Sequence, residues 1–384
     1  MHAGNRLTLL ENGAGYFPAL LDAIAHARRE IHLESYIFEM DDIGLRVAHA
    51  LIDAAERGVQ VRVLVDGIGS KDFSEELRDR MLKTGIALLF YRPEISPWRL
   101  KRARLRRMHR KIVVIDACLA YIGGINIVDD RTGQESAAVR YDAAVRVEGP
   151  VLADICKAVD RLWLLVRWSR LRKRPAKQQA LPACVAEAGD QNTAFLERDT
   201  LRHRDDIEKA YLTAIAGARR EIIIANAYFL PGRRFRKALV DATERGVRVV
   251  LLLQGRSDHR LVRWASRALY GYFLDRGVGI VEYHASEMHA KVAVIDDEWS
   301  TVGSSNIDPF SLMLAREANL VIRDAEFNRE LRASLLVAIE RGGVAMHRRT
   351  WAELPWHQRA GSWLVYGAVR WIISILGYGH LDAA

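Results

Sequence analysis

Two nineteen-residue stretches of this 384-residue chain share one pattern of polar residues. The first, MHRKIVVIDACLAYIGGIN, covers residues 108–126, and the second, MHAKVAVIDDEWSTVGSSN, covers residues 288–306. Each has the order His-x-Lys-x4-Asp, followed at fixed spacing by Gly and Asn. The shared residues are His109, Lys111, Asp116, Gly123 and Asn126 in the first stretch, and His289, Lys291, Asp296, Gly303 and Asn306 in the second.

These side chains suit the transfer of a phosphoryl group. The ammonium and the amide would stabilise negative charge on phosphate oxygens, and the imidazole could attack phosphorus or deliver a proton. One stretch supplies one histidine, whereas phosphodiester exchange without a metal needs two: a nucleophile, and a group that acts as acid and then as base. We therefore expect the two stretches to face each other across a single active site.

A nucleophilic histidine needs its second ring nitrogen held, usually by a carboxylate that fixes its tautomer. Each repeat has one candidate downstream of its motif, Asp142 in RYDAAVRV and Glu317 in REANLVIR. Both acids open an apolar, strand-like run. We expect Asp142 and Glu317 to orient the two histidines.

The repetition extends beyond the motifs, which indicates an internal duplication. AIAHARREIHLESYIF (residues 23–38) matches AIAGARREIIIANAYF (214–229), and AERGVQVRVLVDG (55–67) matches TERGVRVVLLLQG (243–255). Each copy alternates helical apolar spacing with short β-rich runs. This order predicts two tandem α/β sandwich domains, each with a largely parallel central sheet.

The elements predicted around the motifs would position the polar residues. HRKIVVID and HAKVAVID are typical of strands, in which residues two apart share a face, so the His and Lys of each copy should point the same way. The Gly and Asn of each copy are expected on the next strand. We expect a first domain over residues 1–168, a basic linker over 169–192, a second domain over 193–345 and an amphipathic tail over 346–384.

The composition restricts partners and compartment. The chain has 57 Lys and Arg against 48 Asp and Glu, a net charge of +9, which points to anionic membranes, nucleic acid or phosphate-bearing substrates. Its three cysteines, Cys118, Cys156 and Cys184, are odd in number and far apart, so we expect no disulfide framework and infer a reducing compartment. The N-terminus lacks the basic-then-apolar order of an export signal.

Two segments are candidates for membrane contact. The run RLKRARLRRMHRK (99–111) has eight Lys or Arg residues and favours contact with anionic head groups, the alternative being a solvated basic loop. The tail GSWLVYGAVRWIISILGY (361–378) is the most apolar stretch, but its length and Arg370 argue against a membrane span. It would lie at the membrane interface or pack on the protein's own surface.

The paired motif resembles the phospholipase D superfamily and, within it, the bacterial cardiolipin synthases of the B type. The resemblance rests on RRMHRKIVVID, GGIN, YFLPG, GRSDH, MHAKVAVIDD and GSSNIDPFSL, and it covers the chain up to about residue 345. It implies two pseudo-symmetric phospholipase D-like domains with a shared active site at their interface. It also implies a phosphohistidine intermediate and no metal or other cofactor.

The resemblance implies roles for the motif residues. His109 would be the nucleophile, and His289 the general acid and then the base. The other residues expected to contact the phosphoryl group are Lys111, Lys291, Asn126, Asn306 and, assisting, Ser304. The aspartates Asp116 and Asp296 belong to the catalytic motif, where we expect them to support the structure. Gly124 stands where the second copy has Ser304, so any hydroxyl contribution is one-sided.

The implied activity is that of a cardiolipin synthase, which moves the phosphatidyl group of phosphatidylglycerol to a hydroxyl of a second phospholipid and releases glycerol. The expected partners are phosphatidylglycerol, cardiolipin and the membrane surface, with no nucleic acid. The expected location is peripheral, on the cytoplasmic side of the bacterial inner membrane. Two alternatives stay open: a hydrolase of the same superfamily, acting as phospholipase D or nuclease, and a non-catalytic membrane-binding protein.

Overall fold

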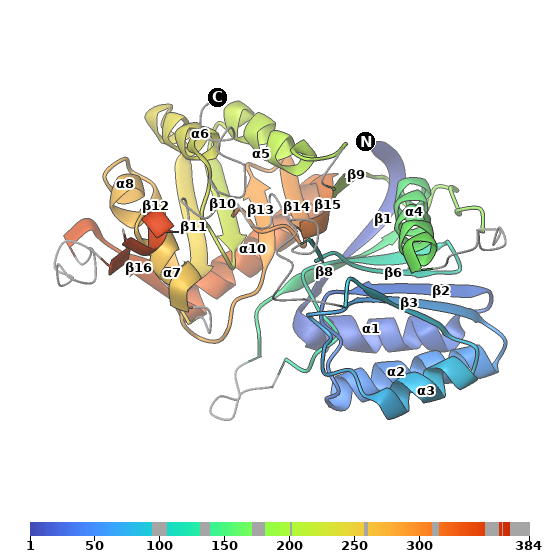
Figure 1. Cartoon of the computed structure of the whole chain (residues 1–384). Helices are drawn as coiled ribbons and strands as arrows, with labels where there is room; N and C mark the ends of the chain where they lie inside the picture. The colour runs from blue at the N-terminus through green and yellow to red at the C-terminus, as the bar shows by residue number, and fades with distance from the viewer. Residues whose placement is uncertain are drawn as a thin grey trace.

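The computed structural model of the chain consists of two similar halves joined side by side (Figure 1). It describes residues 1–93, 106–130, 139–170, 181–199, 202–256, 260–308, 315–349, 361–362 and 364–368. The first half consists of β1 (His2–Glu11), α1 (Asn12–His26), β2 (Glu30–Ser35), α2 (Asp42–Glu56), β3 (Gln60–Asp66), α3 (Glu75–Lys83), β4 (Ala87–Tyr91), β5 (Arg107–Met108), β6 (Lys111–Ile115), β7 (Leu119–Gly123), β8 (Ala143–Glu148) and α4 (Leu152–Arg170).

The second half repeats most of this order. It consists of β9 (Gln191–Arg198), α5 (Asp206–Gly217), β10 (Glu221–Asn226), α6 (Arg233–Glu244), β11 (Arg248–Gln254), α7 (Arg260–Arg267), α8 (Tyr270–Leu274), β12 (Gly279–Tyr283), β13 (Lys291–Ile295), β14 (Trp299–Gly303), β15 (Ala315–Arg323), α10 (Ala325–Gly342) and β16 (Gly343–Met346). The helices and strands predicted from the two longer repeats are thus present in both halves.

The strands form one sheet that runs through both halves. Its order is β16-β12-β11-β10-β13-β14-β15-β9-β1-β8-β7-β6-β2-β3-β4, and the halves meet where β1 pairs with β9. The prediction of a largely parallel sheet is wrong. Parallel pairing is found within β2-β3-β4 and β10-β11-β12, whereas the motif strands β6-β7 and β13-β14 form antiparallel hairpins. Their turns are too short for the crossover that a parallel pair needs.

The hydrophobic core is arranged in layers about this sheet. One cluster packs α1, α2 and α3 on one face of the first half, and a matching cluster packs α5, α6 and α8 on the second half. A third cluster contains residues of α4 and α10 together with strands of both halves, including Val145, Ile155, Leu320 and Leu331. Because this core is shared, the two halves are buried against each other rather than tethered.

The predicted domain boundaries fall close to element ends. Helix α4 ends at Arg170, and β9 begins at Gln191, between which residues 171–180 of the expected linker lie outside the described structure. Residues 99–105 of the basic run and residues 369–378 of the apolar tail also lie outside it. The described part of the tail packs on the second half, where Tyr366 is buried and accepts a hydrogen bond from Arg236 at 3.3 Å. None of the helices in the described ranges has both the length and the apolar character needed to cross a membrane.

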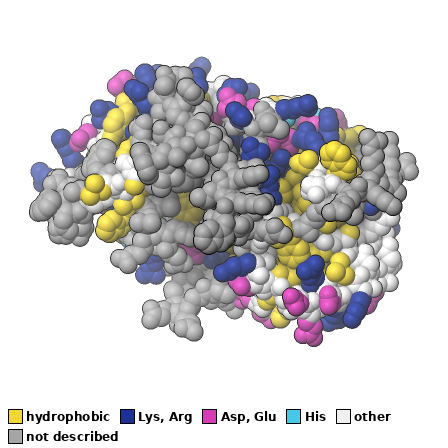
Figure 2. All heavy atoms as spheres, viewed as in Figure 1, with side chains coloured by type: hydrophobic (Ala, Val, Ile, Leu, Met, Phe, Trp, Pro, Cys, Tyr) yellow, Lys and Arg dark blue, Asp and Glu magenta, His cyan; other side chains and the backbone are white. Residues whose placement is uncertain are grey.

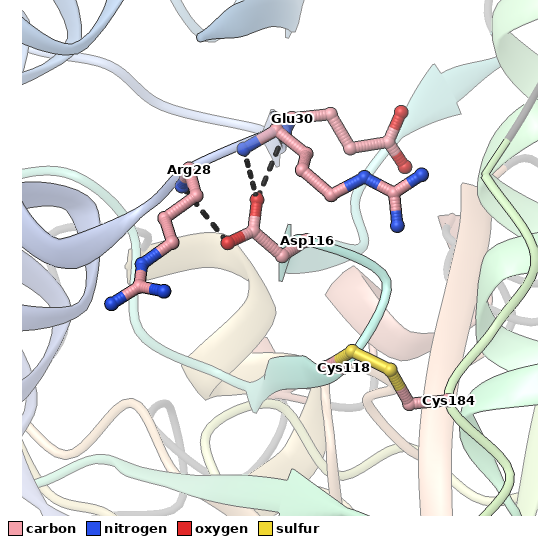
Figure 3. Close-up of a disulfide and its surroundings, with 6 residues drawn as sticks. Arg28, Glu30, Asp116, Cys118 and Cys184 are labelled. Carbon is pink, nitrogen blue, oxygen red and sulfur yellow. Dashed lines mark hydrogen bonds between the residues drawn. A yellow bond between two sulfur atoms is a disulfide. The ribbon is translucent and has the colours of Figure 1, made fainter.

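The cysteines depart from the sequence expectation, because Cys118 and Cys184 form a disulfide (Figure 3). The two residues are 66 positions apart, but the backbone N–H of Cys184 donates to the carbonyl of Ala117 at 2.9 Å, which brings the chain segments together. Sequence spacing does not report such a contact. The pairing removes the cysteine argument for a reducing compartment.

The motif aspartates occupy matching turns. Asp116 and Asp296 follow the first strand of each hairpin with positive φ angles of 52°. The Asp116 carboxylate accepts hydrogen bonds from the backbone N–H groups of Arg28, Arg29 and Glu30 (Figure 3). The Asp296 carboxylate accepts the equivalent bonds from residues 219–221. Each aspartate thus ties the motif hairpin to the start of the neighbouring strand.

We predict that Asp296→Asn lowers the free energy of unfolding by about 1.5–3 kcal/mol, because an amide cannot replace a carboxylate that accepts three backbone N–H bonds. Asparagine tolerates the left-handed backbone, so strain does not confuse the result. Asp297→Asn is the matched control, since Asp297 forms an exposed ion pair with Arg220 that water screens, so its loss should change the stability little. Urea unfolding curves measure both. Equal stability of the two variants would contradict the structural role of Asp296.

Candidate active site

The backbone of each motif histidine is held by the opposite half of the molecule. The N–H of His109 donates to the carbonyl of Arg316 at 2.9 Å, next to the short parallel pairing of β5 with β15. The N–H of His289 donates to the carbonyl of Tyr141 at 2.8 Å, beside a bridge between Tyr141 and Met288. The two motifs therefore meet at the interface between the halves.

The side chains cross the interface in the same way. Nδ1 of His109 lies 3.1 Å from both carboxylate oxygens of Glu317, and Nδ1 of His289 lies 2.7 Å from Asp142. The sequence places one acid in each repeat, and the structure pairs each histidine with the acid of the other repeat. A carboxylate at Nδ1 favours the tautomer with the proton there, which leaves Nε2 with its lone pair free to react.

The two carboxylates are supported differently. The hydroxyl of Ser304 donates to Glu317 at 2.6 Å, and Ser304 is fully buried. At the matching position of the first half, a Cβ on Gly124 would lie 2.1 Å from the Asp142 carboxylate. Glycine is thus required there by close packing. The structure directs the Ser304 hydroxyl to Glu317, whereas the resemblance implied that it would assist at the phosphate.

Two residues at strand ends hold the backbone just before each histidine. Asp66, at the end of β3, accepts from the N–H of Met108 at 2.8 Å, and Gln254, at the end of β11, accepts from Met288 at 3.0 Å. Sequence reasoning did not single them out. Their equivalent positions in the repeats AERGVQVRVLVDG and TERGVRVVLLLQG, next to the final glycine, are the signal that could have found them.

The motif lysines are buried beside the histidines. Lys111 is 3 % exposed and donates to the carbonyl of His109 at 2.6 Å, and the fully buried Lys291 makes the matching bond to His289. Burial and the charge of Lys291 lower the pKa of Lys111 to about 7. Burial lowers the pKa of Lys291 to about 8, against the opposing charge of Asp142. Two buried ammonium groups beside the two histidines form a site for an anion.

The same positive charges act on the histidines. Burial lowers the pKa of His109 against the opposing charge of Glu317, and Lys111 lowers it further. Burial, Lys291 and Lys111 hold the pKa of His289 well below its usual value. Burial raises the pKa of Asp142 to about 6 against the charge of Lys291. At neutral pH the two imidazoles are therefore neutral and Asp142 is ionised.

The motif asparagines follow the hairpins instead of lying within their second strands, because β7 and β14 end at Gly123 and Gly303. Asn126 is 4 % exposed and accepts from the N–H of Ile37 at 3.2 Å. The side-chain oxygen of Asn306 is buried and has no hydrogen-bond partner within the described part of the chain. A buried amide in this condition is costly unless a ligand satisfies it.

Tyr36 is a further site residue that the sequence did not point to. Its ring centroid lies 4.8 Å from that of His109, and Nζ of Lys111 lies 5.4 Å from the ring centroid. The repeat alignment places Ala227 at the equivalent position of the second half. Among the described residues, the aromatic contact at His109 is not matched at His289, a difference that the alignment of the two repeats could have flagged.

Comparisons with the sequences of known proteins identify the family of this chain. The family described as "Cardiolipin synthase, PLD-like domain" matches residues 20–163 and 211–336, one segment in each half. Cardiolipin synthase B of Escherichia coli (strain K12) is 42% identical, across 91% of this chain and 86% of that protein. Cardiolipin synthase B of Salmonella typhi is 40% identical, across 98% of this chain and 90% of that protein.

The fold is also that of a solved structure. Phosphatidylserine synthase of Haemophilus influenzae Rd KW20 superimposes with a TM-score of 0.72 and 15% sequence identity, covering 96% of this chain and 94% of that one. At this identity the likeness supports the two-half α/β fold alone. The sequence matches carry the assignment, and they confirm the resemblance predicted from the repeated motif. The chain belongs to the cardiolipin synthase family of PLD-like phosphatidyltransferases.

Proposed function

We propose that the chain makes cardiolipin by transferring the phosphatidyl group of one phosphatidylglycerol to a hydroxyl of a second. The observation that carries this proposal is the crossed pairing of the two histidines with Glu317 and Asp142, which leaves both Nε2 atoms free beside two buried lysines. In this proposal Lys111 and Lys291 bind the phosphodiester, and Asn126 and Asn306 contact its oxygens.

In the first step Nε2 of His109 attacks phosphorus, and the bond from phosphorus to the glycerol head group breaks. The neutral state of His109 supports its role as nucleophile. His289 supplies the proton that the departing glycerol oxygen requires. It can do so because the bound phosphodiester is anionic and offsets the charges of Lys291 and Lys111, which raises the pKa of His289 from the low value that burial and these lysines cause.

In the second step a hydroxyl of another phospholipid attacks the phosphatidyl-histidine. His289, now neutral, accepts the hydroxyl proton, the new P–O bond forms and the P–N bond to His109 breaks. Two molecules of phosphatidylglycerol thus give one cardiolipin and one glycerol, and both histidines return to their starting state. Glu317 and Asp142 hold the imidazoles in the reactive tautomer throughout, while Tyr36 packs on His109 and limits its rotation.

Lipid substrates place the protein at a membrane, and we propose a peripheral position on the bacterial inner membrane. Support comes from the family assignment and from the excess of basic residues, 57 against 48 acidic. The expected cytoplasmic face rested in part on the cysteine count. Since Cys118 and Cys184 pair, the proposal extends to the membrane but not to one of its faces.

Mass spectrometry of lipids tests the function directly. Purified protein is incubated with phosphatidylglycerol vesicles and a chelator, beside the variants His109→Ala and His289→Ala. We expect cardiolipin and glycerol from the wild type, and a loss of about a thousandfold or more in either variant, because each histidine performs a step that the other cannot. Asp297→Asn, which removes only an exposed ion pair with Arg220, serves as the control with full activity.

Other products would replace the proposal in specific ways. Phosphatidic acid without cardiolipin would mean that water is the acceptor and that the protein is a hydrolase. No change in lipid, together with cleavage of nucleic acid, would move the function to a nuclease. Unchanged cardiolipin formation in the His109→Ala variant would remove this site from the reaction.

The shifted pKa values predict a narrow pH optimum. Asp142 loses its charge as the pH falls below about 6, and Lys111 and Lys291 lose theirs as the pH rises through about 7 and about 8. We expect kcat/KM to be bell-shaped, with the alkaline side expressed as a rising KM because the neutral lysines bind the anionic substrate weakly. Initial rates on phosphatidylglycerol in detergent micelles measure the profile.

Lys111→Arg separates this cause from others, since Lys111 is the first of the two lysines to lose its charge and arginine keeps its charge throughout the range. Its overall rate will fall through altered geometry, but its alkaline limb should move to higher pH by about one unit or more. An alkaline limb that stays in place in both Lys111→Arg and Lys291→Arg would show that the lysines do not set it.

A further inference from the structure

The outer face of α4 changes character along its length. Its solvent-facing stripe begins with Asp154, Lys157 and Arg161, as expected for a helix on a protein surface. The stripe then continues with Leu164, Leu165 and Trp168, which are 46%, 47% and 61% exposed. Figure 2 shows hydrophobic side chains together with Lys and Arg side chains at the position of α4. Exposed leucine and tryptophan on adjacent turns indicate an interaction surface rather than a solvated face.

The inner face of the same turns is already satisfied. Leu162, Trp163 and Val166 are 5% exposed or less and pack in a small cluster with Leu64, Tyr91 and Met108. The core contact of these turns is therefore complete without Leu164, Leu165 and Trp168. Folding of the chain does not explain why these three exposed side chains are apolar. Because Met108 directly precedes His109, this end of α4 lies close to the first motif.

Two basic segments leave the described structure at this end of α4. The chain departs after Pro93, two residues beyond Tyr91, and returns at Arg106, two residues before Met108. The stretch between, residues 94–105, has four Lys or Arg and one Glu. The second segment, residues 171–180, directly follows α4 and has four Lys or Arg with no acid. The sequence is thus basic both between Pro93 and Arg106 and directly after the end of α4.

We propose that Leu164, Leu165 and Trp168 form a docking surface, the α4 stripe, that binds the surface of a bilayer containing anionic phospholipid. Tryptophan and leucine enter the boundary between head groups and acyl chains, and adjacent basic residues attract anionic head groups. The alternative is a protein partner with acidic patches that match the basic residues. The combination of apolar and basic residues at one helix end fits an anionic membrane more closely.

This inference rests on the proposed function, since a phosphatidyltransferase must take its substrates from a bilayer. The inference goes beyond the proposed function because it names the surface that meets the membrane. The α4 stripe belongs to the first half, beside the His109 motif. The described tail residues, 361–362 and 364–368, in contrast, pack on the second half through Tyr366. Docking through α4 would place the first motif near the lipid surface.

The test compares wild type with the triple variant Leu164→Ser/Leu165→Ser/Trp168→Ser. Binding is measured by sedimentation with vesicles of phosphatidylglycerol and phosphatidylcholine, and with phosphatidylcholine alone. We expect the variant to bind the anionic vesicles about tenfold more weakly or worse, because three apolar side chains no longer leave water. Its rate on short-chain phosphatidylglycerol dispersed below its micelle concentration should equal that of the wild type.

A matched control has the same chemistry elsewhere: Leu45→Ser/Leu82→Ser/Val337→Ser changes residues that are 40%, 44% and 42% exposed. It should bind vesicles like the wild type. Equal vesicle binding by the α4 variant would overturn the inference, as would tryptophan emission that shifts identically with vesicles in the wild type and Trp168→Phe. Vesicle binding that depends on the α4 stripe, without any cardiolipin product, would uphold the docking surface and refute the proposed function. The two failures are therefore distinguishable.

Discussion

The site depends on one interaction made twice, the hydrogen bond between a motif histidine and a carboxylate from the opposite half. Glu317 is fully buried and Asp142 is 2 % exposed, and a buried carboxylate without a partner is strongly unfavourable. The pairs therefore require the halves to stay together, and the shared core and the β1–β9 contact hold them there. Neither half can assemble a complete histidine-carboxylate pair from its own residues.

The duplication has left the two halves similar in backbone and different around the histidines. His109 has a glutamate held by Ser304 and an aromatic ring from Tyr36, whereas His289 has a shorter aspartate packed against Gly124. Burial and neighbouring charges lower both imidazole pKa values, that of His289 more strongly. The two histidines have different roles, attack and proton transfer, although they come from two copies of one motif. These roles require different surroundings.

The sequence predicted the motif, its chemistry and the duplicated α/β elements, because repetition and apolar periodicity are local and survive in one chain. It could not predict the crossed pairing, since nothing in the spacing of Asp142 and Glu317 says which histidine each one reaches. The parallel-sheet prediction failed because strand direction around the motif depends on hairpins that periodicity does not report. The Cys118–Cys184 pair and Tyr36 likewise depend on contacts between segments far apart in the chain.

The most direct test of the crossed site is the pre-steady-state release of nitrophenol from a phosphatidyl nitrophenyl ester, a leaving group that needs no proton. His289→Ala and Asp142→Asn should keep a burst of about one nitrophenol per site, because attack by His109 is intact. His109→Ala and Glu317→Gln should lose it. Grouping of the variants by repeat, His109 with Asp142 and His289 with Glu317, would contradict the crossed pairs, and a burst lost only in His289→Ala and Asp142→Asn would contradict His109 as the nucleophile.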